Sequence, residues 1–268
     1  MKRDISALLK EWAFKPGQVN ARFVTGNDGA ERVQVRLDLG ILQMHADGRP
    51  DGMKPFGFAS LLEYFEAKMD ETGGERAQGM RGEPEEPREE LGEAEEVSLT
   101  GDDCRALREE AAQFYQRYVA CLALEDYERV IRDTTRNLRV LDVCAKHAAE
   151  DQDRQVLEQF RAYIVMVRAR ALASQCIKDN ELKAAVLAID NALDHLKKYF
   201  ATTDKPQQFE LADEVRMLRS MREALAPKLP ISQKAELKQR LQRAIETENY
   251  ELAAILRDEL KQLKNNDA

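Results

Sequence analysis

The sequence has no run of 18 apolar residues, and charged residues interrupt the apolar stretch near its start, MKRDISALLKEWAF. A transmembrane helix needs roughly 20 consecutive apolar residues, and a secretory signal peptide needs an uninterrupted apolar region. The sequence therefore predicts no membrane span and no signal peptide. We expect a cytoplasmic protein.

Residues that usually carry metal or redox chemistry are scarce. The chain has four cysteines without a CxxC pair and three histidines without an HxxxH pair. Cys144 and His147 could share a helical face, but a structural zinc site needs four ligands. We expect no metal and no other cofactor. The four cysteines, which we expect to be small buried hydrophobic residues, are Cys104, Cys121, Cys144 and Cys176.

Motifs of nucleotide binding and catalysis are also missing. No GxxxxGK[ST] loop occurs, and no GxGxxG follows a strand. The glycines of DGRPDG (residues 47–52) could cradle an anion, but its aspartates would repel one. The sequence has many carboxylate pairs, which are typical of solvated helix faces. None of these pairs has the apolar surroundings that raise a carboxyl pKa. We therefore expect no catalytic residue and a protein that is not an enzyme. An enzyme would have a deep pocket with a perturbed titratable group.

Aromatic residues make up only 6% of the chain, whereas 34% of residues are charged and 43% are hydrophobic. This composition favours a helical, well-solvated protein over a β-sandwich, and it still allows a substantial core. We predict a mainly α fold: a scaffold of helical hairpins with a small N-terminal α+β module and a C-terminal helical hairpin.

The net charge of −8 comes from one segment. Eleven acidic and three basic residues lie between Asp70 and Glu96, so the rest of the chain sums to zero. Five glycines, two prolines and few large apolar residues in the same segment are typical of chain that does not fold. We predict a flexible acidic linker over residues 70–101, with an acidic docking tail as the alternative. No folded part has the basic excess of a protein that binds phosphate backbones.

The pattern before this linker is that of strands. VNARFVT (19–25) and ERVQVRLDL (31–39) alternate apolar and polar residues around GNDGA, whose Asn-Asp-Gly suits a hairpin turn. We expect one face of the second strand to be covered and the other to be wet. The following GILQMHADGRPDGMKPFGF is dense in turn residues and precedes a short helix. We predict a small α+β module over residues 1–69. The residues on the covered face would be Val33, Val35, Leu37 and Leu39.

From residue 102 onward the apolar spacing is helical, and Pro227 and Pro230 mark the end of this region. Short connections make successive helices antiparallel neighbours. We expect Leu193 to lie at the centre of a buried stripe. The predicted helices run near 103–123, 126–148, 153–178, 180–200 and 206–225.

One of these helices resembles the second helix of a tetratricopeptide repeat (TPR). Ala185, Ile189 and Ala192 have the family's spacing, and a weaker copy follows Tyr127. The copies are about 55 residues apart, whereas the family repeats every 34 or so. The resemblance implies TPR-like helical hairpins over residues 102–227. A plain four- or five-helix bundle explains the same periodicity.

Two short amphipathic arms follow in ISQKAELKQRLQRAIETENYELAAILRDELKQL (231–263). The first arm carries one apolar stripe, and Asn249 can cap the second arm, which carries a matching stripe. We predict a helical hairpin over residues 231–264. A segment this short is below the roughly 40 residues at which a chain can fold alone. Its stripe must therefore dock on something.

The stretch NYELAAILRDEL (249–260) resembles the UVR motif, a hairpin found at the C-terminus of UvrB and in the middle of UvrC. The resemblance implies protein–protein binding and brings no catalytic residue. UvrB's helicase motifs, UvrC's nuclease signatures and the cysteine-ligated zinc modules of other UVR-bearing proteins do not occur. Alternatively, the hairpin closes the preceding helical domain. The partner-binding residues that we expect are Leu237, Leu241, Ile245, Tyr250, Ala253, Leu256, Arg257 and Leu260.

These patterns favour a non-catalytic adaptor or scaffold whose hairpin binds a protein partner with a pair of helices. A second copy of the chain is one candidate partner, and we expect neither a membrane nor nucleic acid. The alternative is an accessory factor of DNA repair or of another nucleic-acid process, which would retain DNA in a salt-sensitive way. It rests on the UVR resemblance and on basic residues near the β-hairpin, namely Lys2, Arg3, Lys10, Arg22, Arg32 and Arg36.

Overall fold

The computed structural model describes residues 4–79, 98–203, 206–225, 233–247, 250 and 252–258. Helix dominates these residues, and the strands found among them form one antiparallel sheet near the N-terminus. The predicted fold class is confirmed: mainly α, with a small N-terminal sheet and C-terminal helices. Contacts divide the chain into two compact units, residues 1–221 and 222–268.

The sheet has three strands in the order β1-β2-β3, after a short helix α1 (Ser6–Glu11). The predicted hairpin is present, because β1 (Ala21–Thr25) pairs with β2 (Glu31–Arg36) around the expected turn. Sequence reasoning missed β3 (Ile41–His45), which pairs with β2 and which we had assigned to turns. Its five residues lie between Gly40 and the turn residues that begin at Asp47, so the turn signals concealed a short strand.

The covered face of β2 is shorter than predicted. Val33 and Val35 are buried, as expected, but Leu37 and Leu39 are exposed. The strand ends at Arg36, and the chain then turns, with the Leu37 N–H donating to the carbonyl of Gly40. The stripe therefore stops two residues before the first leucine that we had assigned to the core.

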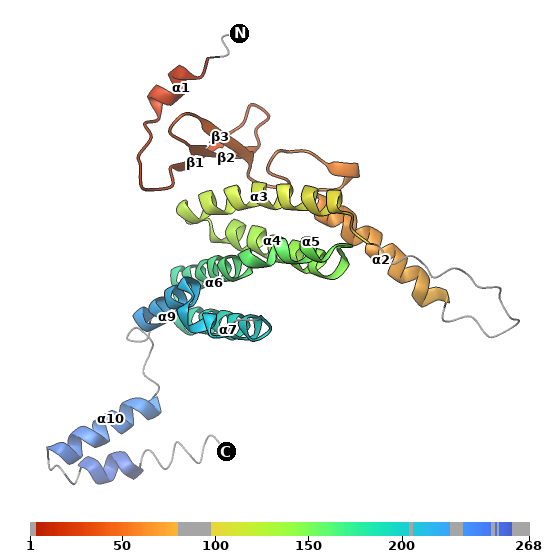
Figure 1. Ribbon diagram of the computed structural model, residues 1–268. Helices are drawn as coiled ribbons and strands as arrows, with labels where there is room; N and C mark the ends of the chain where they lie inside the picture. The colour runs from red at the N-terminus through yellow and green to blue at the C-terminus, as the bar shows by residue number, and fades with distance from the viewer. Residues whose placement is uncertain are drawn as a thin grey trace, which may run out of the picture. The chain divides into compact units, whose positions relative to one another are not determined.

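The helices of the first unit lie in a row (Figure 1). Helix α3 packs on α4, α4 on α6, and α6 on α7. Three of the five predicted helices are confirmed within a few residues. The predicted helix 153–178 is broken into three pieces, and the predicted helix 206–225 is broken into two at Ala212. The elements are α3 (Gly101–Ala123), α4 (Tyr127–His147), α5 (Asp151–Val156), the 3-10 turn η2 (Glu158–Phe160), α6 (Arg161–Lys178), α7 (Leu182–Ala201), α8 (Gln208–Leu211) and α9 (Asp213–Leu225).

Capping fixes where the longest helices begin. The Thr100 hydroxyl accepts from the Asp103 N–H while the Asp103 carboxylate accepts from the Thr100 N–H, a capping box at the start of α3. At the start of α4 the Asp126 carboxylate accepts from the Arg129 N–H. A capping box is worth about 1 kcal/mol of helix stability. These caps fix the first residues of α3 and α4.

The N-terminal residues share hydrophobic clusters with this row of helices. Leu62 and Phe65 of α2 (Leu61–Gly79) pack with Leu107 of α3, and Val33 of the sheet packs with Tyr118 of α3. We predicted residues 1–69 as a module of their own, whereas the described residues belong to the same compact unit as the helices. A 3-10 turn, Pro55–Gly57, precedes α2.

The predicted linker differs from the structure at its N-terminal end, because helix α2 extends into it. It continues through residues 70–79, which we had assigned to the flexible segment. The rest of that segment, residues 80–97, lies outside the described residues. Residues 98–100 then lead into α3, with Leu99 paired to Ala148 by a parallel bridge.

Candidate partner-binding site

The C-terminal unit contains two helical stretches, α10 (Gln233–Glu246) and residues 252–258. Ala244 of the first stretch and Ala253 and Leu256 of the second form a buried cluster, and Leu241 packs against it. Alanines allow two helices to approach closely, and Leu256 fills the contact between them. This cluster therefore holds the two arms of the hairpin together.

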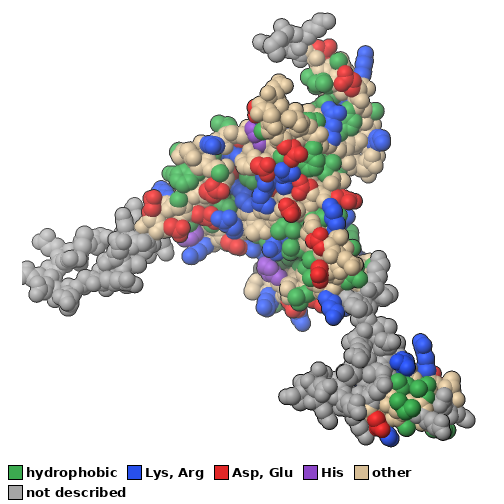
Figure 2. All heavy atoms as spheres, turned by 180° about the vertical axis from the view of Figure 1, so that it is seen from behind, with side chains coloured by type: hydrophobic (Ala, Val, Ile, Leu, Met, Phe, Trp, Pro, Cys, Tyr) green, Lys and Arg blue, Asp and Glu red, His purple; other side chains and the backbone are tan. Residues whose placement is uncertain are grey.

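Other large apolar side chains of the hairpin face outward. Ile245 is 47% exposed, Tyr250 is 68% exposed and Ile255 is 59% exposed. Figure 2 shows hydrophobic side chains gathered on the part of this unit that it describes. Ile255 and Leu256 are neighbours in sequence, yet one is outward and the other is 1% exposed. The hairpin thus has an internal apolar face and an external one.

The predicted partner-binding residues divide between these two faces. Ala253 and Leu256 lie in the internal cluster, with Leu241 at its edge. Ile245 and Tyr250 are exposed. The Arg257 side chain is exposed too, with its Nε 3.3 Å from Oδ1 of Asp258. The side chain of Leu237, the whole of Leu260 and the predicted cap Asn249 lie outside the described residues.

A comparison with protein families identifies the motif to which this C-terminal hairpin corresponds. Residues 232–266 match the model of the UvrB/uvrC motif, UVR. The predicted UVR resemblance is therefore confirmed for the C-terminal hairpin, and the TPR-like resemblance is not. No match was found among curated proteins or among solved structures.

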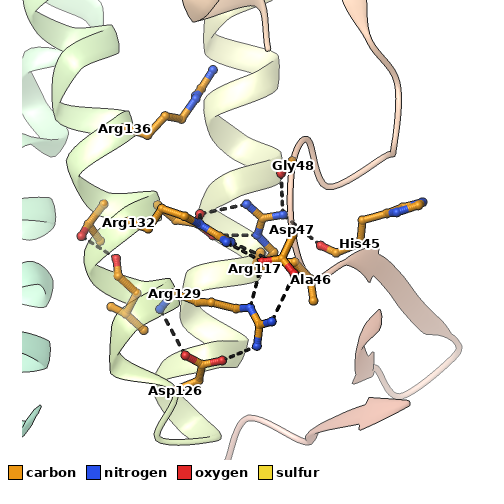
Figure 3. Close-up of polar contacts among 12 residues, drawn as sticks. His45, Ala46, Asp47, Gly48, Arg117, Asp126, Arg129, Arg132 and Arg136 are labelled. Atoms are coloured by element: carbon orange, nitrogen blue, oxygen red, sulfur yellow. Dashed lines mark hydrogen bonds and ion pairs between the residues drawn. The ribbon is translucent and has the colours of Figure 1, made fainter. Parts of the chain in front are cut away.

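A second cluster of functional groups, which sequence reasoning missed, lies where the loop after β3 meets α3 and α4 (Figure 3). Arg117 of α3 donates from Nε and Nη2 to both oxygens of Asp133 on α4, at 2.7 and 2.8 Å. Its Nη1 donates to the carbonyls of His45 and Gly48, at 2.9 and 2.7 Å. One buried guanidinium therefore joins both helices to the loop.

Two more arginines, both on α4, bind the same loop. Arg132 donates to Asp47 at 2.6 Å and to the Ala46 carbonyl at 2.8 Å. Arg129 donates to both oxygens of Asp47 and, at 2.7 Å, to Asp126. The hydrogen bond from Arg129 is the main cause that lowers the pKa of Asp47 to about 2. The same contact raises the pKa of Arg129.

The third part of this cluster surrounds Glu110 of α3, whose side chain is completely buried. Its carboxylate contacts Nη2 of Arg136 and lies 3.3 Å from Nη1 of Arg49, and it accepts from the Leu61 N–H at the start of α2. We expected the carboxylate pairs to lie on solvated helix faces, whereas Glu110, which follows Glu109, is buried, and so is Asp133. The available signal was polar residues at apolar-stripe positions of α4, such as Asp133 and Asn137.

The cluster also explains the segment DGRPDG. Its carboxylates are occupied by arginines, because Asp47 pairs with Arg129 and Arg132, and Asp51 pairs with Arg49. Gly52 has a φ of +75°, and a β-carbon there would lie 2.5 Å from the His45 ring. Glycine is therefore required at that turn.

Of the basic residues that supported a nucleic-acid role, Lys2 and Arg3 lie outside the described residues, and the three arginines of the sheet are engaged by neighbouring groups. Arg32 and Arg36 are buried, the first bound to Asp28 and the second to the Trp12 carbonyl. Arg22 lies 4.2 Å from the centre of the Trp12 ring and donates to Gln34. In Figure 2 acidic and basic side chains are interleaved across the middle of the face shown.

Three of the four cysteines, Cys104, Cys121 and Cys144, are buried in the helical row as predicted, and Cys176 is half-buried. Within the described ranges, no group of three or more His, Cys, Asp or Glu side chains could hold a metal ion. A search of those same ranges found no helix that is long and apolar enough to cross a membrane.

Proposed function

We propose that this chain is a non-catalytic protein–protein adaptor whose UVR hairpin docks on a partner that presents a pair of amphipathic helices. The outward position of Ile245, Tyr250 and Ile255 is the observation that carries this proposal. Single exposed apolar side chains are ordinary on protein surfaces. Three large exposed apolar side chains on one small hairpin provide an apolar surface that a bound partner would cover.

The internal cluster explains why the hairpin can offer this surface. Ala244, Ala253 and Leu256 close the two arms on each other, so the outward residues are not needed to hold the arms together. A helix or helix pair buries apolar side chains spaced along a partner's helices. A helical partner therefore suits side chains displayed along α10 and residues 252–258.

A capture experiment tests the proposal. The full-length chain, the variant Ile255→Asp and the matched control Leu211→Asp would be immobilised, and the proteins retained from a cell extract would be compared by mass spectrometry. Leu211 is also an exposed leucine-sized apolar residue, but it lies in α8, outside the hairpin. The supporting result is a defined protein that the wild-type chain and Leu211→Asp retain and Ile255→Asp loses.

The reason for the expected loss is the new carboxylate. Placing an unpaired charge in a desolvated contact costs several kcal/mol, which is enough to abolish a moderate affinity. If Ile255→Asp retained the same proteins in the same amounts as the wild-type chain, the outward face of the hairpin would not be the docking surface.

A further inference from the structure

A cavity of about 370 Å³ lies between α3, α4 and the residues that lead into α6. Much of its described lining comes from one face of α3, where residues three and four positions apart are neighbours. Helix α4 contributes Asn137, and α6 contributes Tyr163. Tyr115 and Phe160 line the cavity and are also exposed, so a small molecule can enter beside them.

The size of this cavity suits a ligand with two rings. Protein interiors are packed about as densely as organic crystals, so empty apolar space forfeits contacts. A cavity of roughly 150 Å³ with apolar walls stays dry and binds benzene. The cavity between α3, α4 and α6 has more than twice that volume. It therefore has room for two fused rings.

The lining offers no unpaired charge. Arg108 is the charged residue among the described lining residues, and its Nη1 lies 2.6 Å from Oδ1 of Asp153. Asn137 is also engaged, because its Nδ2 donates to the Ala111 carbonyl at 3.0 Å and its Oδ1 accepts from Arg136. A charged ligand would therefore lose its hydration without gaining a partner of opposite charge.

One buried polar group of the lining has no hydrogen-bond partner among the described residues, namely the hydroxyl of Tyr118. The residue is only 1% exposed. Burial is the main cause that raises the pKa of Tyr118, and it also raises the pKa of Tyr163. Both phenols are therefore neutral near pH 7, where they donate hydrogen bonds and do not act as bases. A buried donor without an acceptor is costly, so an acceptor is expected beside Tyr118.

The aromatic rings of the lining favour a planar aromatic ligand. The ring centres of Tyr115 and Tyr118 are 5.4 Å apart, with an angle of 85° between the planes. Those of Tyr115 and Tyr163 are 6.3 Å apart, with an angle of 52°. Rings at such angles present faces and edges in different directions, so a flat ligand can stack on one ring and meet the edge of another.

From this cavity we propose that the chain binds a neutral, planar two-ring aromatic molecule that carries a hydrogen-bond acceptor, such as a carbonyl oxygen. The rings fill the apolar space between α3, α4 and α6, and the carbonyl oxygen accepts from the Tyr118 hydroxyl. The cavity lies within the first compact unit, so this site does not depend on the proposed role of the hairpin.

2-Acetylnaphthalene, a neutral two-ring ketone, is the probe for the test. Isothermal titration calorimetry on the full-length chain would compare it with naphthalene-2-carboxylate, which has the same rings and a negative charge. We expect the ketone to bind and the carboxylate to bind at least about tenfold more weakly, because its charge has no partner in the cavity. No binding of the ketone, or equal binding of the two compounds, would overturn the proposal.

Tyr118→Phe tests the hydrogen bond, because it keeps the ring and removes the hydroxyl. We expect it to weaken binding of the ketone about fivefold, as loss of one neutral hydrogen bond does, and to leave binding of naphthalene, which has no acceptor, unchanged. Tyr127→Phe is the matched control, since Tyr127 is a half-buried tyrosine of α4 outside the described lining. Wild-type affinity of Tyr118→Phe for the ketone, or an equal loss for both compounds, would contradict the role of the hydroxyl.

Ala112→Trp tests the location of the site, because Ala112 lines the cavity from an exposed position on α3 and an indole there would occupy the space. Ala145→Trp is the control, since Ala145 is an exposed alanine of α4 outside the described lining. Circular dichroism would check that both variants keep the wild-type fold. We expect Ala112→Trp to lose binding of the ketone and Ala145→Trp to keep it. Undiminished binding to Ala112→Trp would place the ligand elsewhere and overturn the assignment.

Discussion

Arg117 and Asp133 form a two-point ion pair between α3 and α4, and both side chains are completely buried. Arg117 also holds the loop after β3 through the carbonyls of His45 and Gly48. The pair therefore joins the N-terminal residues to the helical row. A buried pair of this kind is costly to break, because the remaining partner stays desolvated and uncompensated.

We expect Arg117→Met to lower the free energy of unfolding by about 3–5 kcal/mol, since it leaves Asp133 with a weaker set of donors. Denaturant unfolding monitored by circular dichroism measures the change. Arg105→Met is the control: that arginine pairs with Asp102 on the surface, and its loss should cost less than about 1 kcal/mol. Equal midpoints for the Arg117 variant and the wild-type chain would show that the pair does not join these parts.

The contact between Asp47 and the α4 arginines predicts a loss of stability in acid. The folded-state pKa of Asp47 is lowered from 3.8 to about 2, chiefly by the hydrogen bond from Arg129. A lowered carboxyl pKa contributes stability that is present above the unfolded-state pKa and is lost as the pH falls towards the folded-state value. The window for Asp47 therefore lies between about pH 4 and pH 2.

We expect Asp47→Asn to destabilise the chain at pH 6, with the difference from the wild-type chain disappearing as the pH falls to 2. The effect is less than about 1 kcal/mol, because the Asp47 side chain is two-thirds exposed and solvent screens its ion pairs. Urea unfolding across this pH range measures it. A difference that stays constant down to pH 2 would assign the stabilisation to something other than the charge of Asp47.

Cysteine reactivity reports whether the helical row stays closed. Burial raises the pKa of Cys121 and of Cys144 to about 12, and it also raises the pKa of Cys104. The thiolate is the reactive form, so these three buried thiols should be inert at pH 8. We expect a chromogenic disulfide reagent to label Cys176 in the native chain and the other three only after denaturation. Rapid native labelling of Cys104 or Cys144 would mean that the contact between α3 and α4 opens readily.

The buried face of helix α7 is not centred on Leu193, as we had predicted. Leu193 is half-buried, whereas Leu196 is completely buried together with Ile189. We expect Leu196→Ala to cost roughly 2–5 kcal/mol, as truncation of a buried leucine does. Leu193→Ala should cost clearly less in the same denaturant titration. A larger cost at Leu193 than at Leu196 would contradict the packing of α7 on α6.

Local signals predicted much of this fold. Apolar spacing located the helices of the row, and Asn-Asp-Gly located the turn between β1 and β2. The strand β3 escaped because five residues between turn signals are too few to show a period. In α7 we had centred the buried face on Leu193 because large apolar side chains form a stripe around it. The alanines at 185 and 192 are buried as well, so the centre of the buried face lies beside Leu193.

The arginine cluster could not be predicted in the same way. Its pairs join residues far apart in sequence, such as Arg117 with Gly48 and Arg136 with Glu110. Charged residues on a helix usually face solvent, and only tertiary packing reveals that these do not. The sequence pattern of the hairpin likewise does not reveal its tertiary packing. Its pattern identified Ile245 and Leu256 as apolar positions, but the pattern does not show which face is internal.

Two neighbouring residues of the hairpin, Ile255 and Leu256, give the most direct test of the account, in one experiment on full-length variants. Amide hydrogen exchange of residues 233–258 and retention of the captured partner would be measured on the same samples of Ile255→Asp and Leu256→Asp. We expect Ile255→Asp to keep wild-type amide protection and lose the partner, because its side chain is outward. Leu256→Asp should lose both, because its side chain closes the hairpin. Retention of the partner by Ile255→Asp, with the hairpin intact, would contradict docking through the outward face.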